Sequence, residues 1–132
     1  MKINRAVLNE IIAQAKNELP DESCGYLLAN AEGIIDESFP MTNIDHSPEH
    51  FSFDPKEQFA AIKHSRQTGK KLVANWHSHP SSPSRPSVED IKLAYDSTIS
   101  YFILSLATEE PVFNGFHIEN GSVEKLVVEV VD

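Results

Sequence analysis

Apolar residues recur three or four positions apart between Arg5 and Leu19, and polar residues fill the positions between them. This spacing is typical of an amphipathic helix that buries one face. Asn4 stands where a helix cap is expected, and Pro20 follows the last apolar position, where it cannot continue a helix. The pattern therefore predicts a helix from Arg5 to Leu19.

The next apolar segments are shorter and predict extended structure. Cys24–Ala29 has the length and composition of a strand, and Ile34–Phe39 follows it after the turn-forming residues Asn30–Gly33. Two strands joined by such a turn form a hairpin. The segment Met41–Phe53 has scattered His, Pro and Ser residues, so only short extended pieces are expected there.

A second helix is predicted to begin after this irregular segment. Asp54 supplies a cap, Pro55 takes the first helical position, and Glu57 stands three residues after the cap. This order of residues is a common helix start. The helix is expected to reach about Thr68 and to end at Gly69, because glycine readily adopts the left-handed conformation found after helices.

The second half of the chain begins with a short apolar run, Leu72–Trp76, which suits a buried strand and leads directly to His77. The Pro- and Ser-rich segment Pro80–Pro86 is a loop. A third helix is predicted from Ser87 to about Asp96, and the strongly apolar Ile99–Leu106 is predicted to be a strand.

Two more strands are expected at the end of the chain, over Val112–Ile118 and Val123–Val131. The dipeptide Asn120-Gly121 between them suits a tight hairpin turn. No internal repeat is present, and the mixed order of helices and strands favours an α/β or α+β fold with one central mixed sheet flanked by helices. The 132 residues fit a single domain, residues 1–132.

Composition and charge narrow the class of protein. With 40% hydrophobic and 23% charged residues, the chain has enough apolar side chains for a globular core. The formal net charge of −9 would repel nucleic acid and anionic membrane surfaces, and no apolar run approaches the ~20 residues of a membrane span. The single cysteine, Cys24, and the lack of a signal segment lead us to expect a cytoplasmic protein.

The segment from His77 to Asp90 carries the candidate chemistry. In an extended backbone, side chains two residues apart project to the same face, so His77 and His79 can offer two nitrogens to one ion. Asp90 can add an oxygen from the helix start after a loop stiffened by three prolines. Two imidazoles, one carboxylate and a free fourth position describe a catalytic zinc site, although two histidines near a strand end are more often simply solvated or buried with partners.

The same segment resembles the signature of the JAMM, or MPN+, metalloprotease family, which is a distant upstream Glu followed by H-x-H-P-x6-S-x-x-D. Every fixed position is present here at the family spacing. The resemblance implies that His77, His79 and Asp90 bind Zn2+, that Ser87 is the motif serine, and that Glu22 is the catalytic glutamate.

The resemblance extends from the first helix to the strand at Ile99–Leu106. Asn43, Phe51, Asp54 and Pro55 also resemble the family's segment before its second helix. It implies the JAMM/MPN fold, which is similar to that of cytidine deaminases. One departure concerns a turn: Asn30 follows the first strand where many compact bacterial members have glycine.

The family chemistry implies a mechanism. Zinc lowers the pKa of a bound water towards ~7, and Glu22 is expected to accept its proton and return it to the leaving amine. Ser87 is expected to stabilise the oxyanion, but a serine three residues before an acid at a helix start is also a common cap. Its hydroxyl would then have to turn between the two partners.

The resemblance also implies a substrate class, the C-terminus of a ubiquitin-like or sulfur-carrier protein. The expected reaction is hydrolysis of a peptide or isopeptide bond after the carrier's Gly-Gly, with the tail bound as an added strand. Three alternatives stay open: a metallopeptidase acting on phage-tail or cell-wall peptides, a non-catalytic MPN-type binding scaffold, and a thiol peptidase that uses Cys24.

The remaining candidate residues are assigned structural places. Cys24 is expected to pack in the first apolar strand, and Trp76 is expected in the core. The other histidines are expected on the surface or in loops; they are His46, His50, His64 and His117. Of these, His46 and His50 lie in the irregular segment and could border a substrate groove. Nothing in the pattern indicates the oligomeric state.

Overall fold

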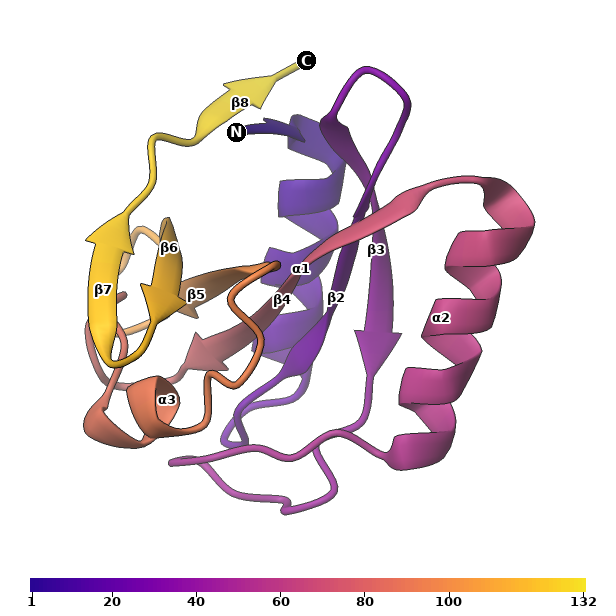
Figure 1. Ribbon diagram of the computed structural model, residues 1–132. Helices are drawn as coiled ribbons and strands as arrows, with labels where there is room; N and C mark the ends of the chain where they lie inside the picture. The colour runs from indigo at the N-terminus through magenta and orange to yellow at the C-terminus, as the bar shows by residue number, and fades with distance from the viewer.

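Eight strands form one curled mixed sheet in the computed structural model, which describes residues 1–132. The strand order is β7-β6-β5-β4-β2-β3-β1-β8, so β4 and β2 lie in the middle of the sheet (Figure 1). The predicted fold class, a single mixed sheet with flanking helices, is confirmed. None of the helices is both long and apolar enough to span a membrane.

The N-terminal region contains one strand that the pattern did not predict, β1 (Lys2–Asn4), before α1 (Arg5–Asn17). The helix starts as predicted, because the Asn4 side chain accepts a hydrogen bond from the Ala6 amide at 2.8 Å. It ends two residues before the predicted Leu19. Leu19 is 47% exposed, so no packing holds it in the helix, and the residue before a proline avoids helical geometry.

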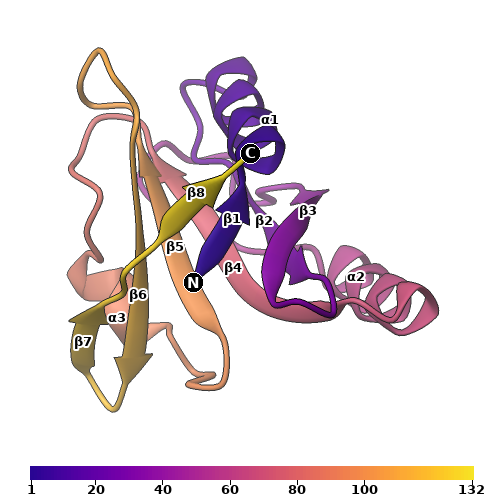
Figure 2. The same ribbon diagram turned by 90° about the horizontal axis from the view of Figure 1, so that it is seen from above.

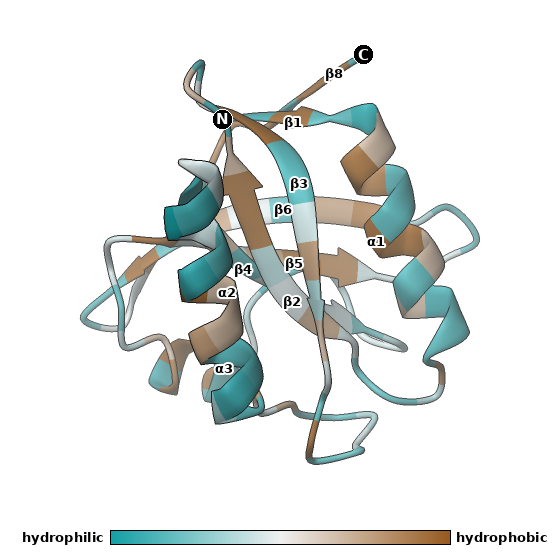
Figure 3. Ribbon diagram, turned by 90° about the vertical axis from the view of Figure 1, so that its right-hand side faces the viewer, coloured by the Kyte–Doolittle hydropathy of each residue, from teal (hydrophilic) through white to brown (hydrophobic).

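The predicted hairpin is confirmed as β2 (Cys24–Ala29) and β3 (Ile34–Met41). All six residues of β2 are buried, because β2 pairs with β3 on one side and β4 on the other. Helix α1 covers one face of these strands with buried Val7, Ile11 and Ala15, and Figure 3 shows it on the opposite side of the sheet from α2 and α3.

Helix α2 (Pro55–Thr68) has the predicted bounds. The Asp54 carboxylate accepts a hydrogen bond from the Lys56 amide at 2.9 Å, and Gly69 adopts the left-handed conformation with φ of 72°. Ala61 is the one buried residue of this helix, so α2 presents most of its surface to solvent and stands beside the sheet (Figure 2).

Strand β4 (Lys71–His79) is longer than the predicted Leu72–Trp76. It runs antiparallel to β2 and parallel to β5 (Ser100–Ser105), and its pairing with β5 continues to the register His79–Ser105. Both histidines therefore lie inside a central strand. The prediction ended too early because His77-Ser78-His79 is polar in sequence, whereas all three residues are buried.

Helix α3 (Val88–Lys92) is shorter than predicted, since the expected end was Asp96. It has no buried residue, and Tyr95 is 83% exposed, so no apolar face prolongs it. The Asp96 carboxylate instead accepts hydrogen bonds from the backbone and hydroxyl of Thr98, which turns the chain into β5.

The C-terminal hairpin is confirmed only in part. Strands β6 (Val112–Glu119) and β7 (Ser122–Lys125) are joined at Asn120-Gly121, where both residues have positive φ. The single strand predicted over Val123–Val131 is wrong, because the chain leaves the sheet after Lys125. It crosses to the opposite edge and pairs there as β8 (Glu129–Val131), parallel to β1.

Candidate metal centre

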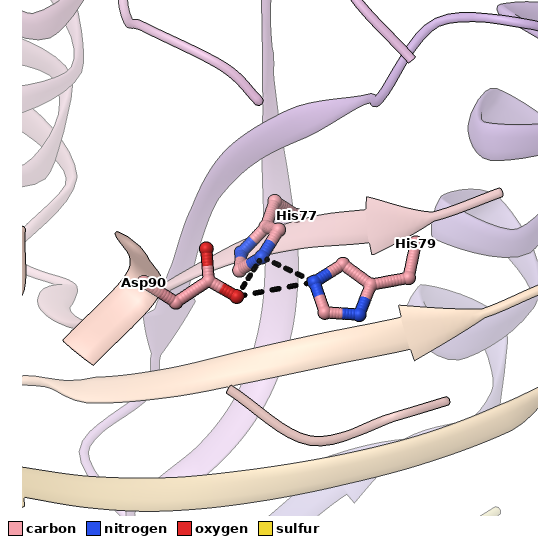
Figure 4. A group of neighbouring side chains, drawn as sticks. All are labelled: His77, His79 and Asp90. Carbon is pink, nitrogen blue, oxygen red and sulfur yellow. Dashed lines mark hydrogen bonds and ion pairs between the residues drawn. The ribbon is translucent and has the colours of Figure 1, made fainter. Parts of the chain in front are cut away.

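The two histidines of β4 and the aspartate of α3 meet at one point (Figure 4). The Nε2 atoms of His77 and His79 lie 3.1 Å apart, and Asp90 Oδ2 lies 3.1 Å from each of them. Both histidine residues are 4% exposed. Three residues predicted from their spacing therefore bring their donor atoms into one small, largely buried triangle.

The triangle fits a zinc ion. A tetrahedral zinc with bonds of about 2.1 Å separates its ligand atoms by about 3.4 Å, close to the 3.1 Å edges formed by His77, His79 and Asp90. Two imidazole nitrogens and one carboxylate oxygen are the donor types of catalytic zinc sites, and three protein ligands leave a fourth position for water or substrate. The donor set can hold a metal ion.

A backbone carbonyl in the Pro-rich loop sets the tautomer of His79. Its Nδ1 lies 2.8 Å from the Pro83 carbonyl oxygen, which can only accept, so Nδ1 carries a proton. Without a metal, Nε2 can also carry a proton and donate it to Asp90; a bound metal would replace that proton and take the Nε2 lone pair. The loop is fixed to the sheet by the Ser84 hydroxyl, which donates to the Ile103 carbonyl at 2.6 Å. The sequence analysis did not predict these two contacts of the loop, although the alternation of serine and proline in this segment was a signal for them.

The charges of the three ligands suit a cation. Burial alone would raise the pKa of Asp90, but hydrogen bonds from His77 and His79 outweigh it and hold that pKa well below its usual range. Burial lowers the pKa of His77. Burial alone would lower the pKa of His79 as well, but the pKa is raised overall, mainly by the hydrogen bond to Asp90. At neutral pH the centre thus contains one anionic carboxylate ready to bind a positive ion.

Ser87 and Asp90 form a reciprocal cap at the start of α3. The Asp90 amide donates to Ser87 Oγ at 3.0 Å, and the Ser87 amide donates to Asp90 Oδ2 at 3.0 Å. In this contact the Ser87 hydroxyl is an acceptor, so its own proton stays free for another oxygen. The expectation that the hydroxyl must turn between a capping and a second role is therefore wrong.

Glu22 lies two residues before β2, in a segment anchored next to the two histidine ligands. The Ser23 amide donates to Ser78 Oγ at 2.7 Å, and the Ser78 amide donates to the Ser23 carbonyl at 2.9 Å, which joins Glu22's neighbour to the residue between His77 and His79. Glu22 is 4% exposed, and its Oε1 has no hydrogen-bond partner. Burial raises the pKa of Glu22 to about 8, although the charge of His79 partly opposes this.

Comparison with known proteins assigns this chain to a family. The model of prokaryotic homologues of the JAB domain matches residues 4–117, which include Glu22, the three ligand residues and Ser87. The chain belongs to the prokaryotic JAB family. The recognised resemblance to JAMM/MPN+ proteins is therefore confirmed.

Relatives of this JAB-family chain match it over nearly all of its length. The CysO-cysteine peptidase of Mycobacterium tuberculosis is 31% identical over 135 residues, which cover 98% of this chain and 90% of the relative. The solution structure of DSY2949 from Desulfitobacterium hafniense is 38% identical, with a TM-score of 0.90 over 99% of this chain and 92% of the other. A structure described as a JAMM metalloprotease-like zinc site in the proteasome and signalosome is 26% identical, with a TM-score of 0.64 over 100% and 98%.

Asn43 organises the loop that covers Glu22 in this JAB domain. Its side-chain nitrogen donates to the carbonyls of Glu22 and His50, both at 3.0 Å, and its oxygen accepts from the amides of Asp45 and Ser52 at 3.0 and 3.3 Å. The side chain is buried. The hydrogen bonds of this one side chain thus hold a segment whose only backbone pairing is the single bridge between Asn43 and Phe53.

An aromatic residue of the same loop contacts the metal centre. The rings of Phe51 and His77 stack with centroids 4.7 Å apart. This contact limits the rotation of His77 and shields it from water. The sequence signal was the family-like position of Phe51, which gave no indication of the partner.

The other candidate residues do not belong to the ligand triangle, although Cys24 pairs with His77 across β2 and β4. Cys24 is buried, and burial raises the pKa of its thiol to about 12, so the site provides no thiolate for a thiol peptidase. His50 contacts Asp45 at 3.0 Å and His64 contacts Glu37 at 2.7 Å. Trp76 is fully buried in the core, as predicted.

Proposed function

We propose that this JAB-family protein is a zinc-dependent peptidase, and that residues 1–132 act as one catalytic domain. The observation that carries the proposal is the buried ligand triangle of His77, His79 and Asp90 with a buried, unpartnered carboxyl, Glu22, anchored beside it. Buried carboxyls without partners are unfavourable for folding, and their presence next to a metal site suits a proton-transfer role.

The three ligand residues would hold the ion, and its identity as zinc rests on their donor types. When bound there, zinc supplies a Lewis acid and a water of lowered pKa. Asp90 contributes a full negative charge, and His79 presents Nε2 because Pro83 retains the proton on Nδ1. Family membership and the zinc-site structure among the similar folds support the same metal.

Glu22 is assigned the proton transfers. Its carboxyl is screened from bulk water, so once ionised it can take a proton from the attacking water and return it to the leaving amine. Ser87 is assigned to the oxygen of the scissile carbonyl, because its hydroxyl proton is not used in the helix cap. Both residues come from the edges of elements that meet at the metal centre.

The substrate we propose is a ubiquitin-like or sulfur-carrier protein, cleaved after its C-terminal Gly-Gly. The similarity to a peptidase named for a carrier conjugate, over nearly the whole chain, supports this class. The net charge of −9 makes nucleic acid an unsuitable partner. The cytoplasmic location expected from the sequence stays a prediction.

The test is incubation of a carrier protein that bears a short extension after Gly-Gly with zinc-loaded enzyme, followed by mass spectrometry. We expect loss of the extension. Glu22→Gln should retain one metal ion per chain and lose turnover, Asp90→Ala should lose the metal, and Glu18→Gln, an exposed neighbour on the same segment, should behave like the wild type.

Three outcomes would contradict the proposal. An unchanged carrier mass with cleavage of cell-wall or phage-tail peptides would transfer the chemistry to that substrate class. Purified protein that binds no metal at all would favour a binding scaffold. Full activity of Glu22→Gln would remove the assigned base.

A further inference from the structure

A cavity of about 460 Å³ adjoins the metal centre, and its lining includes Gln58 of α2 and Glu89 and Asp90 of α3. Its floor consists of two rows of residues. Tyr26, Asn75 and Tyr101 form one row across three paired strands, and His77 and Ile103 form the row next to it. The cavity therefore begins at a metal ligand and continues along β4 for one further side chain.

Asn75 is a polar residue of this floor whose side-chain oxygen accepts no hydrogen bond from the protein. Its side-chain oxygen is buried without a hydrogen-bond partner. Its two neighbours are occupied, because Tyr26 accepts from the Gln58 amide at 3.1 Å and Tyr101 donates to the Asp96 carbonyl at 2.7 Å. An unpartnered amide oxygen is unfavourable for folding, and a turn of the Asn75 side chain towards the cavity that it lines would offer this oxygen to a ligand.

The walls of the cavity favour a positively charged occupant. Besides the metal ligand Asp90, whose charge a bound ion would take up, two carboxylates line it, Glu89 and Asp96, and neither lysine nor arginine does. Five aromatic rings line it too, and ring faces attract cations; they are Tyr26, Phe51, Phe53, Tyr95 and Tyr101. A ligand with an apolar stem and a cationic end matches both surfaces, whereas a carboxylate would be repelled.

We propose that this cavity binds the side chain of the residue that follows the cleaved bond, and that it selects lysine or arginine there. The inference rests on the proposed function: the acyl side of the bond is Gly-Gly, which has no side chains, so a cavity of this size serves the leaving group. Asn75 and His77 are two residues apart on β4, which separates them by about 6.6 Å, a span that an extended lysine or arginine side chain covers.

The test uses peptides of the form Gly-Gly-X with a blocked N-terminus, where X is lysine, arginine, norleucine or glutamate. With zinc-loaded enzyme, kcat/KM should be about tenfold higher for lysine and arginine than for norleucine, the uncharged analogue of the lysine stem, and about a hundredfold higher than for glutamate. Equal values for all four peptides would overturn the inference and leave the proposed peptidase function intact.

Asn75→Leu keeps the shape of the side chain and removes its amide. It should reduce the preference for lysine over norleucine to about threefold or less and leave the melting temperature unchanged or higher, since the amide has no partner within the protein. The matched control is Asn9→Leu on the exposed face of α1, which should leave the preference unchanged. An unaltered preference in Asn75→Leu would exclude Asn75 from recognition.

A binding measurement separates this inference from the proposed function. Lysinamide and norleucinamide, which contain no Gly-Gly bond to cleave, are titrated into the zinc-loaded full chain, and the tyrosine ring signals of Tyr26 and Tyr101 are followed by NMR. Lysinamide should shift these signals at about tenfold lower concentration than norleucinamide. If no peptide is cleaved but lysinamide binds in this way, the peptidase proposal fails and the cavity assignment stands; absence of binding overturns the assignment.

Discussion

Truncation of Asn43 to alanine gives the sharpest test of how the loop over Glu22 is held. The side chain donates from Nδ2 to two carbonyls at 3.0 Å and accepts at Oδ1 from two amides at 3.0 and 3.3 Å. A net hydrogen bond contributes about 1 kcal/mol, so four bonds, partly replaced by water in the variant, give an expected destabilisation of about 2–4 kcal/mol.

This loss is measurable by urea unfolding followed by the fluorescence of Trp76, the single, fully buried tryptophan. The midpoint should fall while the slope stays constant, because the surface exposed on unfolding hardly changes. Turnover should fall as well, since the Glu22 carbonyl loses its donor, while metal content stays at the wild-type level.

Ile44→Ala is the matched control, because Ile44 lies next to Asn43 and is 45% exposed. It should change the free energy of unfolding by less than about 0.5 kcal/mol. A destabilisation of Asn43→Ala within that same range would refute the view that one side chain organises residues 43–53.

Three further predictions concern the metal centre and its surroundings. Ser84→Ala removes the 2.6 Å hydrogen bond to the Ile103 carbonyl, so it should lower the free energy of unfolding by about 1–3 kcal/mol and, in chelator competition, the zinc affinity about tenfold. Ser82→Ala is the control, because the Ser82 side chain makes no such bond. Equal zinc affinities of the two variants would contradict the role of the loop. In metal-free protein, the raised pKa of Glu22, about 8 against 4.5, means that the folded state holds a proton which the unfolded chain releases. The contribution of the Glu22 carboxyl to the stability of the folded state is thus complete below pH 4.5 and is lost as pH rises towards 8. A Glu22→Gln variant whose stability shows the same pH dependence in urea titrations would disprove this. Cys24 in folded protein should resist iodoacetamide in mass spectrometry, because its thiol is buried with a pKa of about 12, and activity should respond to a zinc chelator alone; inactivation by alkylation at Cys24 would revive a thiol mechanism.

The ligand set could be predicted from the sequence because its information is local. His77 and His79 share one face of one strand, and Asp90 follows at a helix start whose capping residue, Ser87, is visible in the sequence. Helix α2 was predictable to the residue for the same reason, since its two ends are marked by Asp54 and Gly69.

The support of the site was not predictable, because its partners are backbone atoms that every sequence contains. The Pro83 carbonyl orients His79, and Asn43 contacts backbone groups of the chain on both sides of the loop. The unused amide of Asn75 becomes visible only when strand pairing places it between two tyrosines.

The errors at the C-terminus have a tertiary cause. The alternation of Val123 to Val131 satisfies a strand pattern, but the chain leaves one sheet edge after Lys125 and pairs at the other edge through β8. Sequence spacing does not report which edge a strand joins. Helix α3 was predicted too long because its apolar residues Leu93 and Tyr95 remain exposed.

Because Asp90 serves both the metal centre and the cap of α3, binding of an ion is coupled to folding of that helix. Oδ2 of Asp90 both accepts the Ser87 amide that caps α3 and faces the two imidazoles, and a helix of five residues is too short to persist by itself. Ion capture and formation of α3 therefore belong to one equilibrium, and hydrogen exchange of residues 88–92 should slow when zinc binds. Since α3 and the residues after it wall the cavity, the proposed selectivity would be lost together with the proposed chemistry when zinc is scarce.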